Sequence, residues 1–150
     1  MKSTTSASGP GRVLLIDDDD MIAGSLRQYL VHRGFPVDVA PDGSAARALM
    51  LSGSYSVVVV DPYLTGGVHR DRSTLVDTVC SLQPHASVIV LTAYDSPAVM
   101  QIAADCKVVA LLTKPQSVVT LSTLITAQMM NAVDVTALSS RSTSSIKDLP

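Results

Sequence analysis

Residues 57–61 read Val-Val-Val-Val-Asp, and the other elements of the chain can be worked out from them. Four β-branched apolar residues in a row are typical of a strand buried on both faces, as in a parallel sheet covered by helices. A carboxylate, Asp61, stands where this strand ends, and Pro62 follows it. Because ligands bind beyond the carboxyl ends of strands in open α/β sheets, Asp61 is predicted to lie at a functional edge.

Length and composition favour one globular domain. The chain has 150 residues, of which 47% are apolar and 16% charged, and its net charge is −2. It contains no Lys/Arg cluster of the kind that follows a phosphate backbone, so no nucleic-acid partner is expected. No apolar run approaches the roughly 18 residues that would span a bilayer. The N-terminus also lacks the apolar stretch of a secretory signal, so we expect a cytoplasmic protein that does not contact membranes.

Four further segments have the pattern of strands, at residues 13–16, 37–39, 88–91 and 108–112. The alternating segment 37–39 is short and is expected at or near an edge of the sheet. A helical pattern follows each strand, and the last one covers about residues 117–132. Five strands that alternate with five helices predict an α/β fold with a parallel sheet and right-handed crossovers.

Four of the predicted helices carry expectations about side chains. In the short helix over residues 44–52, the inward residues should be Ala45, Ala48 and Leu49. The last helix should turn four apolar residues inward and leave two outside; the inward ones are Val118, Leu121, Ile125 and Met129, and the outer ones Val119 and Met130. Cys80 and Cys106 lie in helical patterns without metal-binding spacing, so both are expected to be buried free thiols.

Composition also divides the chain. Residues 1–11 are mostly small and polar, and we expect a flexible tail. Residues 12–133 should form the folded domain. Residues 134–150 are rich in Ser and are expected to be a second flexible tail.

Four of the five predicted strands end in a reactive polar group. Asp17 and Asp18 follow the first strand, and Asp61, Thr92 and Lys114 follow or end the third, fourth and fifth. The carboxyl ends of parallel strands meet at one edge of the sheet, so these side chains should converge. Crowded carboxylates repel unless a cation neutralises them, and hard oxygen ligands suit Mg²⁺.

This arrangement suits phosphoryl transfer. Asp61 is the candidate nucleophile, which would attack phosphorus and form an acyl phosphate. Lys114 would supply a positive charge to the carboxylate and then to the phosphoryl oxygens, and Thr92 a hydroxyl donor. Asp19 and Asp20 are interpreted as acids of the first turn of the following helix.

Four segments together resemble the signature segments of the response-regulator receiver domain of two-component signalling. They are Leu-Leu-Ile-Asp-Asp-Asp at residues 14–19, Val-Val-Val-Asp at 58–61, Val-Leu-Thr-Ala at 90–93 and Leu-Thr-Lys-Pro at 112–115. The resemblance covers about residues 12–132. It implies a flavodoxin-like, doubly wound (βα)₅ fold with a five-stranded parallel sheet in the order 2-1-3-4-5.

The resemblance also implies roles for individual residues. Asp61 is similar to the phosphorylated aspartate, Asp18 to the direct Mg²⁺ ligand, and Asp17 to the acid that holds the ion through water. Tyr63 stands where the family contributes a backbone carbonyl to the metal. Thr92 resembles the switch hydroxyl. Lys114 resembles the family's active-site lysine, and the bond before Pro115 is expected to be cis.

We therefore expect a stand-alone receiver in a phosphorelay, a signalling phosphoprotein rather than an enzyme with a separate substrate. A sensor histidine kinase or phosphotransfer protein would phosphorylate Asp61 with Mg²⁺, and a downstream protein would be contacted. It would catalyse only its own phosphoryl transfer and autodephosphorylation. A homodimer through helix 4, strand 5 and helix 5 is a further expectation, from apolar residues on that face.

Alternatives remain open at this point. The position that usually carries an aromatic switch residue in the receiver family is Leu111 here, which favours a phosphorylation-independent interaction module. A phosphatase of the haloacid-dehalogenase type would explain Asp-x-Asp after the first strand, but it leaves Asp61 without a role. A flavodoxin would need a phosphate loop rich in Ser, Thr and Gly after that strand, and this is absent.

Overall fold

A computed structural model describes residues 11–62, 73–93 and 108–131. The strands are β1 (Val13–Ile16), β2 (Val37–Ala40), β3 (Val57–Val60), β4 (Ser87–Thr92) and β5 (Val108–Thr113). The labelled helices are α1 (Asp20–His32), α2 (Gly43–Ser52) and α3 (Ser73–Leu82). A further helix covers residues 118–131. The helix predicted between β4 and β5 lies outside the described residues.

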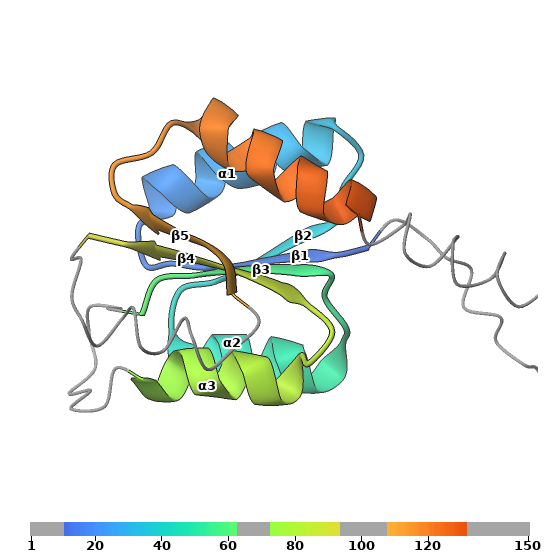
Figure 1. The fold of residues 1–150 in the computed structure, drawn as a ribbon, viewed down its shortest axis with the longest axis vertical. Helices are drawn as coiled ribbons and strands as arrows, with labels where there is room; N and C mark the ends of the chain where they lie inside the picture. Colours follow the sequence, from blue (N-terminus) through green and yellow to red (C-terminus); the bar gives the residue numbers. More distant parts are fainter. Residues whose placement is uncertain (1–10, 63–72, 94–107, 132–150) are drawn as a thin grey trace, which may run out of the picture.

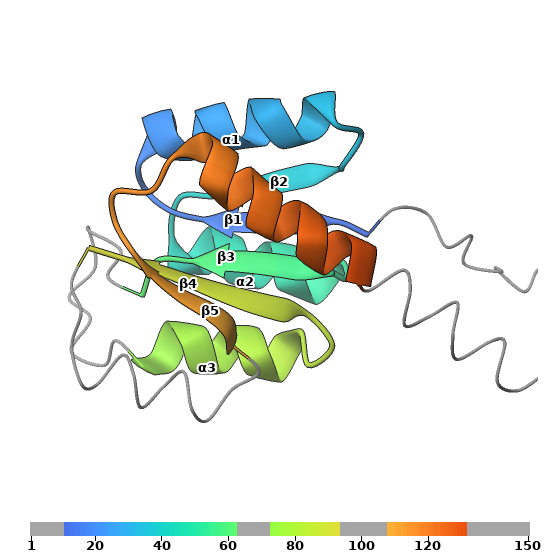
Figure 2. The same ribbon diagram turned by 45° about the horizontal axis from the view of Figure 1, so that its top comes forward.

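The strands form one parallel sheet in the order β2-β1-β3-β4-β5, which confirms the predicted order. Figure 1 shows the sheet between two layers of helices, with α1 and the helix of residues 118–131 on one face and α2 and α3 on the other. In Figure 2, turned by 45°, the strands follow one another from β2 at the top to β5 below, and α1 lies apart from the helix of residues 118–131. β2 lies at an edge, as predicted. Within the described ranges, no helix combines the length and the apolar character needed to cross a membrane.

Both faces of the central strands are covered, which explains their unbroken apolar sequences. In β3, Val58 and Val60 belong to the core cluster beneath α2 and α3. Val57 and Val59 belong to the cluster beneath α1 and residues 118–131. Successive side chains of a strand point to opposite faces, so a strand with helices on both sides has no position for a polar residue before its end. All four residues of β1 and of β3 are accordingly buried.

The ends of the helices follow local rules. Asp19 caps α1, where its carboxylate accepts hydrogen bonds from the N–H groups of Met21 and Ile22. Gly34 follows this helix with a φ of 93°, a conformation that L side chains rarely adopt. Asp42 caps α2 by accepting a 2.7 Å hydrogen bond from the N–H of Ala45. The structure thus confirms that Asp19 and Asp20 belong to the start of a helix.

Two expectations about side chains need correction. In α2, Ala45 and Leu49 pack against the core cluster beneath α2 and α3, as predicted. The fully buried residues, however, are Ala46 and Met50, and Ala48 is exposed. Apolar residues occur on nearly every side of this short helix, so periodicity identified the inner face only in part. Cys80 of α3 is disulfide-bonded and is not the free thiol that we predicted; Cys106 lies outside the described residues. In the last helix, the burial of Leu121, Ile125 and Met129 confirms the predicted face.

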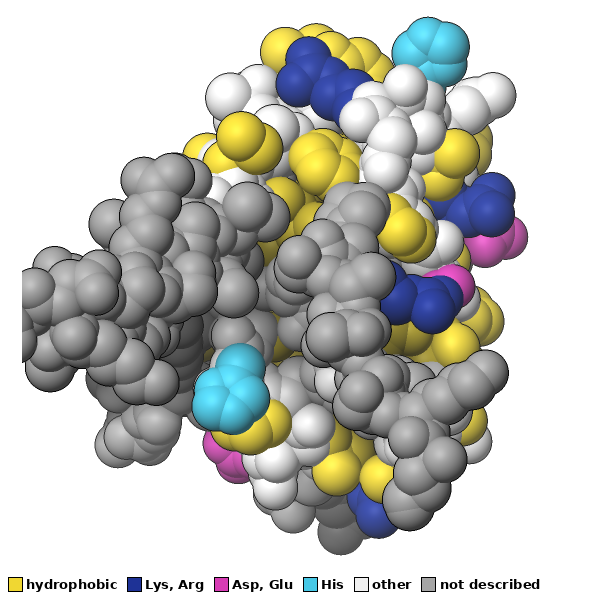
Figure 3. Space-filling view, turned by 90° about the vertical axis from the view of Figure 1, so that its right-hand side faces the viewer, with side chains coloured by type: hydrophobic (Ala, Val, Ile, Leu, Met, Phe, Trp, Pro, Cys, Tyr) yellow, Lys and Arg dark blue, Asp and Glu magenta, His cyan; other side chains and the backbone are white. Residues whose placement is uncertain are grey.

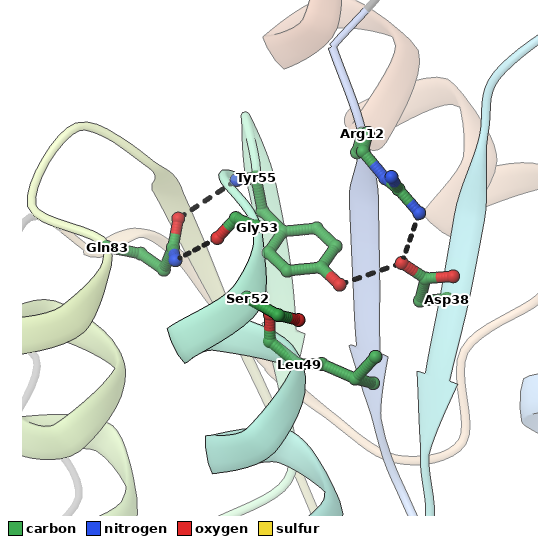
Figure 4. Close-up of polar contacts among 7 residues, drawn as sticks. All are labelled: Arg12, Asp38, Leu49, Ser52, Gly53, Tyr55 and Gln83. Atoms are coloured by element: carbon green, nitrogen blue, oxygen red, sulfur yellow. Dashed lines mark hydrogen bonds and ion pairs between the residues drawn. The ribbon is translucent and has the colours of Figure 1, made fainter.

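A polar network closes the amino-terminal edge of the sheet (Figure 4). The Tyr55 hydroxyl donates a 2.7 Å hydrogen bond to Asp38 on β2, and the Arg12 guanidinium binds the same carboxylate oxygen at 2.7 Å. The backbone N–H of Tyr55 donates to the side-chain oxygen of Gln83, whose amide donates in turn to the carbonyls of Met50 and Gly53. The network joins the first two strands to the connection between α2 and β3 and to the end of α3.

The side chains on the surface of this edge are of mixed character, whereas those of the buried strands behind it are apolar. Figure 3 looks onto it and shows basic, acidic and apolar side chains of the described residues interspersed, without one large patch of a single charge.

The network makes stability depend on the ionisation of Tyr55. Burial, followed by the hydrogen bond to Asp38 and its charge, raises the pKa of Tyr55 from 10.0 to about 12. The unfolded chain therefore loses this proton at a lower pH than the folded chain does. The stabilisation is fully present below pH 10 and is lost as the pH rises towards 12.

Tyr55→Phe should lower the free energy of unfolding at neutral pH by about 1 kcal/mol, because the hydrogen bond to Asp38 is lost. It should also flatten the decline in stability between pH 10 and 12, which denaturant titrations at several pH values would measure. Tyr29→Phe is the matched control, since the hydroxyl of Tyr29 accepts a 3.1 Å hydrogen bond from the exposed Arg33 and takes no part in this network. A wild-type alkaline slope in Tyr55→Phe would contradict this explanation.

Candidate functional site

The register of the sheet places two predicted acids side by side. Ile16 at the end of β1 pairs with Val60 at the end of β3, so the residues that follow them, Asp17 and Asp61, leave the sheet together. Backbone hydrogen bonds fix both positions. The N–H of Asp61 donates to the Ile16 carbonyl at 3.0 Å, and the N–H of Asp17 donates to the Ala40 carbonyl of β2 at 3.1 Å.

Both carboxylates are largely withdrawn from water, since Asp17 is 7% exposed and Asp61 6%. Asp18 is half-buried beside them. The structure brings one carboxylate oxygen of each of these three residues within 4.8 Å of the others. The predicted convergence of acids from the first and third strands is therefore present.

The ammonium group of Lys114 lies between two of the acids. Its Nζ is 2.8 Å from an oxygen of Asp61 and 2.9 Å from an oxygen of Asp17. Burial by itself would lower the pKa of Lys114, but the hydrogen bonds to Asp61 and Asp17 and their charges outweigh it, and the pKa is raised. Lys114 is therefore a firmly protonated cation that holds two buried anions together.

Backbone contacts position the lysine and one of the acids. The N–H of Lys114 donates a 2.7 Å hydrogen bond to the carbonyl of Thr92, the last residue of β4. The peptide bond between Lys114 and Pro115 is cis, as the resemblance implied. The N–H of Asp19 donates a 3.0 Å bond to Asp17 and so orients its carboxylate. This orienting contact was not predicted, because we interpreted Asp19 from the sequence only as a residue at the start of the helix.

Thr92 is fully buried at the end of the strand next to β3. Its position agrees with the prediction that it belongs to this edge, and its backbone joins it to Lys114. Leu111 is partly buried and packs against the core cluster beneath α2 and α3. Tyr63, which we expected to offer a backbone carbonyl, lies outside the described residues.

The donor set fits a small divalent cation. Carboxylate oxygens are the ligands that Mg²⁺ and Ca²⁺ prefer, and Mg²⁺ usually takes one or two carboxylates together with water and phosphate oxygens. Asp17, Asp18 and Asp61 provide such oxygens close together. The same edge of the sheet thus combines a buried carboxylate, a fixed ammonium group and an acidic cluster that suits a metal ion.

The chain matches known proteins over most of its length. The family model described as response regulator receiver domain matches residues 13–126. The transcriptional regulatory protein RprY of Bacteroides fragilis is 32% identical over 82 residues, which are 55% of this chain and 34% of that protein. A cyclic di-GMP phosphodiesterase of Thermotoga maritima is 30% identical over 121 residues, which are 81% of this chain and 32% of that protein. The chain spans about a quarter to a third of the length of such curated relatives.

Solved structures share the fold. A response regulator protein from Burkholderia pseudomallei, with a phosphorylated aspartic acid, calcium ion and citrate, superposes with a TM-score of 0.67 at 30% identity. The match covers 86% of this chain and 72% of that one. A CheY-like receiver domain from Methanospirillum hungatei gives a TM-score of 0.72 at 22% identity, covering 81% of this chain and 94% of that one.

Removal of the ammonium group tests how the site is held together. Lys114→Met should lower the free energy of unfolding by about 3 kcal/mol, because two buried carboxylates would lose their shared partner. Added MgCl₂ should stabilise this variant more than the wild type, since the ion would neutralise the same acids. Thermal unfolding with and without MgCl₂ would measure both effects.

Arg12→Met is the matched control, because the ion pair that it breaks is more exposed. It should cost less than about 1 kcal/mol, and MgCl₂ should not compensate for it. An equal effect of MgCl₂ on both variants and on the wild type would contradict the proposed role of Lys114.

Proposed function

Since this chain belongs to the response regulator receiver domain family, we propose that Asp61 accepts a phosphoryl group from a phosphohistidine. The donor would be a sensor histidine kinase or a phosphotransfer protein of a two-component system. The observation that carries this proposal is the contact of the Lys114 ammonium group with both Asp17 and Asp61, next to Asp18.

Each residue has a distinct part in the transfer. A carboxylate oxygen of Asp61 attacks phosphorus, so that a P–O bond forms while the P–N bond to the donor imidazole breaks. The ammonium group of Lys114, held 2.8 Å from Asp61, can move its hydrogen bond to a phosphoryl oxygen once the acyl phosphate has formed. Thr92 offers a hydroxyl from the neighbouring strand end. Hydrolysis of the acyl phosphate at the same site would return Asp61 to its starting state.

We propose Mg²⁺ as the ion of this site. Asp17, Asp18 and Asp61 would hold it, with the backbone carbonyl of Tyr63 as a further ligand. When bound, the ion would neutralise the negative charge that gathers as a phosphoryl group approaches three carboxylates. The calcium ion in the related phosphorylated structure supports a divalent cation of this class.

Receiver domains are signalling modules, and we propose that the phosphorylated chain acts on a downstream protein in the cytoplasm. No nucleic acid or membrane contact is part of this proposal. That the receiver works as a stand-alone protein stays a prediction of the sequence. The second candidate, a phosphorylation-independent interaction module, is favoured by Leu111, because an aliphatic side chain packed against the core cannot act as an aromatic switch.

A test of whether Asp61 can be phosphorylated distinguishes the receiver from the phosphorylation-independent interaction module. Incubation with acetyl phosphate and MgCl₂ should add the mass of one phosphoryl group to the wild type, and Asp61→Asn should abolish the addition. Asp20→Asn is the matched control, since Asp20 is an exposed acid of α1 outside the acidic cluster. Intact-mass spectrometry measures the result. Unmodified wild-type protein would favour the phosphorylation-independent module.

We also propose that phosphorylated copies pair through the outer face of β5 and the helix of residues 118–131. Val119 and Met130 on this helix are 60% and 55% exposed, and Val109 on β5 is 39% exposed. Val119 and Met130 are eleven positions apart, which places them on nearly the same side of a helix. Helix 4, the third part of the expected surface, lies outside the described residues.

Beryllofluoride, which mimics an acyl phosphate on Asp61, should convert the monomer to a dimer in sedimentation velocity runs with MgCl₂. Val119→Asp should shift this equilibrium at least about tenfold towards monomer, because a charge would be buried at the contact. Leu51→Asp, on α2 at the opposite face of the sheet, is a control of similar exposure. A monomer at every concentration tested, with and without beryllofluoride, would exclude the dimer.

A further inference from the structure

The four acids at residues 17–20 do not all serve the same purpose, and Asp19 connects the site to the helix that follows it. Asp17 is a buried acid of the site, whereas Asp19 is exposed and caps α1. The N–H of Asp19 nevertheless donates a 3.0 Å hydrogen bond to Oδ1 of Asp17. We propose that Asp19 is a positioning residue of the phosphorylation site: its cap on α1 holds Asp17 and, through Asp17, Lys114.

The start of α1 fixes Asp19 on several sides. Its Oδ1 accepts hydrogen bonds from the N–H of Met21 at 3.1 Å and from that of Ile22 at 3.3 Å. Its carbonyl accepts a 3.0 Å bond from the N–H of Ala23. A carboxylate at this position satisfies N–H groups that have no partner within the helix, and negative charge is favoured there. The backbone of Asp19, and with it the direction of its N–H, is therefore held by the helix.

The contact with Asp19 leaves the carboxylate of Asp17 little freedom. Its Oδ1 accepts from the N–H of Asp19, and its Oδ2 lies 2.9 Å from Nζ of Lys114. The backbone N–H of Asp17 is bonded to the Ala40 carbonyl of β2. Rotation of the carboxylate would break one of its two contacts, and Asp17 is only 7% exposed. A buried acceptor that loses its partner costs free energy, so the observed orientation is favoured.

Lys114 is in turn held at two points. Its Nζ lies 2.8 Å from Asp61 as well as 2.9 Å from Asp17. The ammonium group of a lysine is a point charge on a flexible stem, so a second anion in a fixed position restricts where it can lie. A chain of contacts thus runs from the start of α1 to Asp61, by way of Asp17 and Lys114. Its effect on Mg²⁺ rests on the proposed function of the site, whereas its effect on stability does not.

The cap of α2 shows what a cap does when it serves its helix alone. Asp42 is exposed like Asp19, and it precedes α2 as Asp19 precedes α1. It accepts a 2.7 Å hydrogen bond from the N–H of Ala45, and its carbonyl accepts one from the N–H of Ala46. Within the described ranges these bonds stay inside α2. Substitutions of Asp42 therefore measure the loss of a cap without an effect on the site.

A double-mutant cycle in EDTA tests the chain of contacts without metal or phosphate. Denaturant titrations give the unfolding equilibrium constants of Asp19→Ala, Lys114→Met and the double variant. We expect the effect of Asp19→Ala to be about threefold or more smaller in the Lys114→Met background, because Asp17 has then lost the ammonium group against which it is positioned. Asp42→Ala should combine additively with Lys114→Met. An additive result for Asp19→Ala as well would contradict the proposal.

A second measurement needs no change at Lys114 and applies even where Lys114→Met does not fold. Isothermal titration calorimetry gives the Mg²⁺ dissociation constants of Asp19→Ala and Asp19→Asn. Both variants lack the charge, but Asn can cap α1 and Ala cannot, so Asp19→Ala should bind Mg²⁺ about threefold or more weakly than Asp19→Asn.

The pair Asp42→Ala and Asp42→Asn is the matched control for the calorimetry. Both should bind Mg²⁺ like the wild type, although Asp42→Ala loses the cap of α2 and unfolds more readily. Equal Mg²⁺ affinities of Asp19→Ala and Asp19→Asn would overturn the positioning role. A wild type that does not bind Mg²⁺ would instead contradict the proposed function, and the cycle in EDTA would then decide on Asp19 by itself.

Discussion

The contact of one ammonium group with two buried carboxylates is the constraint on which the site depends. Asp17 and Asp61 leave adjacent strands side by side, and like charges at this distance repel strongly where water is largely excluded. Lys114 offsets this repulsion from 2.8 and 2.9 Å. The acids follow β1 and β3, while the lysine follows β5, so the contact forms only when the sheet has its complete strand order. The same three charged groups that complete the fold are the ones to which we assign phosphoryl transfer.

The two edges of the sheet have different roles. At the carboxyl edge, charged side chains lie close together, and Lys114 contacts both Asp17 and Asp61. At the amino edge, Tyr55, Asp38 and Gln83 make hydrogen bonds that hold strands and connections in one arrangement. Between the edges, apolar clusters cover both faces of the sheet. This packed interior holds the charged groups at the carboxyl edge in fixed positions relative to one another.

Some features of the structure could be predicted from short sequence patterns, and others could not. The strands could be predicted because they are buried on both faces, and the site because parallel strands end at one edge. The inner face of α2 was predicted only in part, since a short helix that is apolar nearly all round has no clear periodicity. No sequence pattern indicated the polar network at the amino-terminal edge, because its members, Arg12, Asp38, Tyr55 and Gln83, are far apart in sequence. Cys80 is disulfide-bonded, although the spacing of the cysteines had suggested a free thiol.

The amino-acid sequence was enough to predict the order of the elements, the parallel sheet and the groups at its carboxyl edge, which are Asp17, Asp18, Asp61, Thr92 and Lys114. These are consequences of local hydrophobicity and of where each apolar run stops. Folding in three dimensions added that Lys114 binds Asp17 as well as Asp61, that the N–H of Asp19 orients Asp17, and that Leu111 packs against a core cluster. Distances between residues on different strands depend on register and on the path of the connections, which no single stretch of the chain encodes.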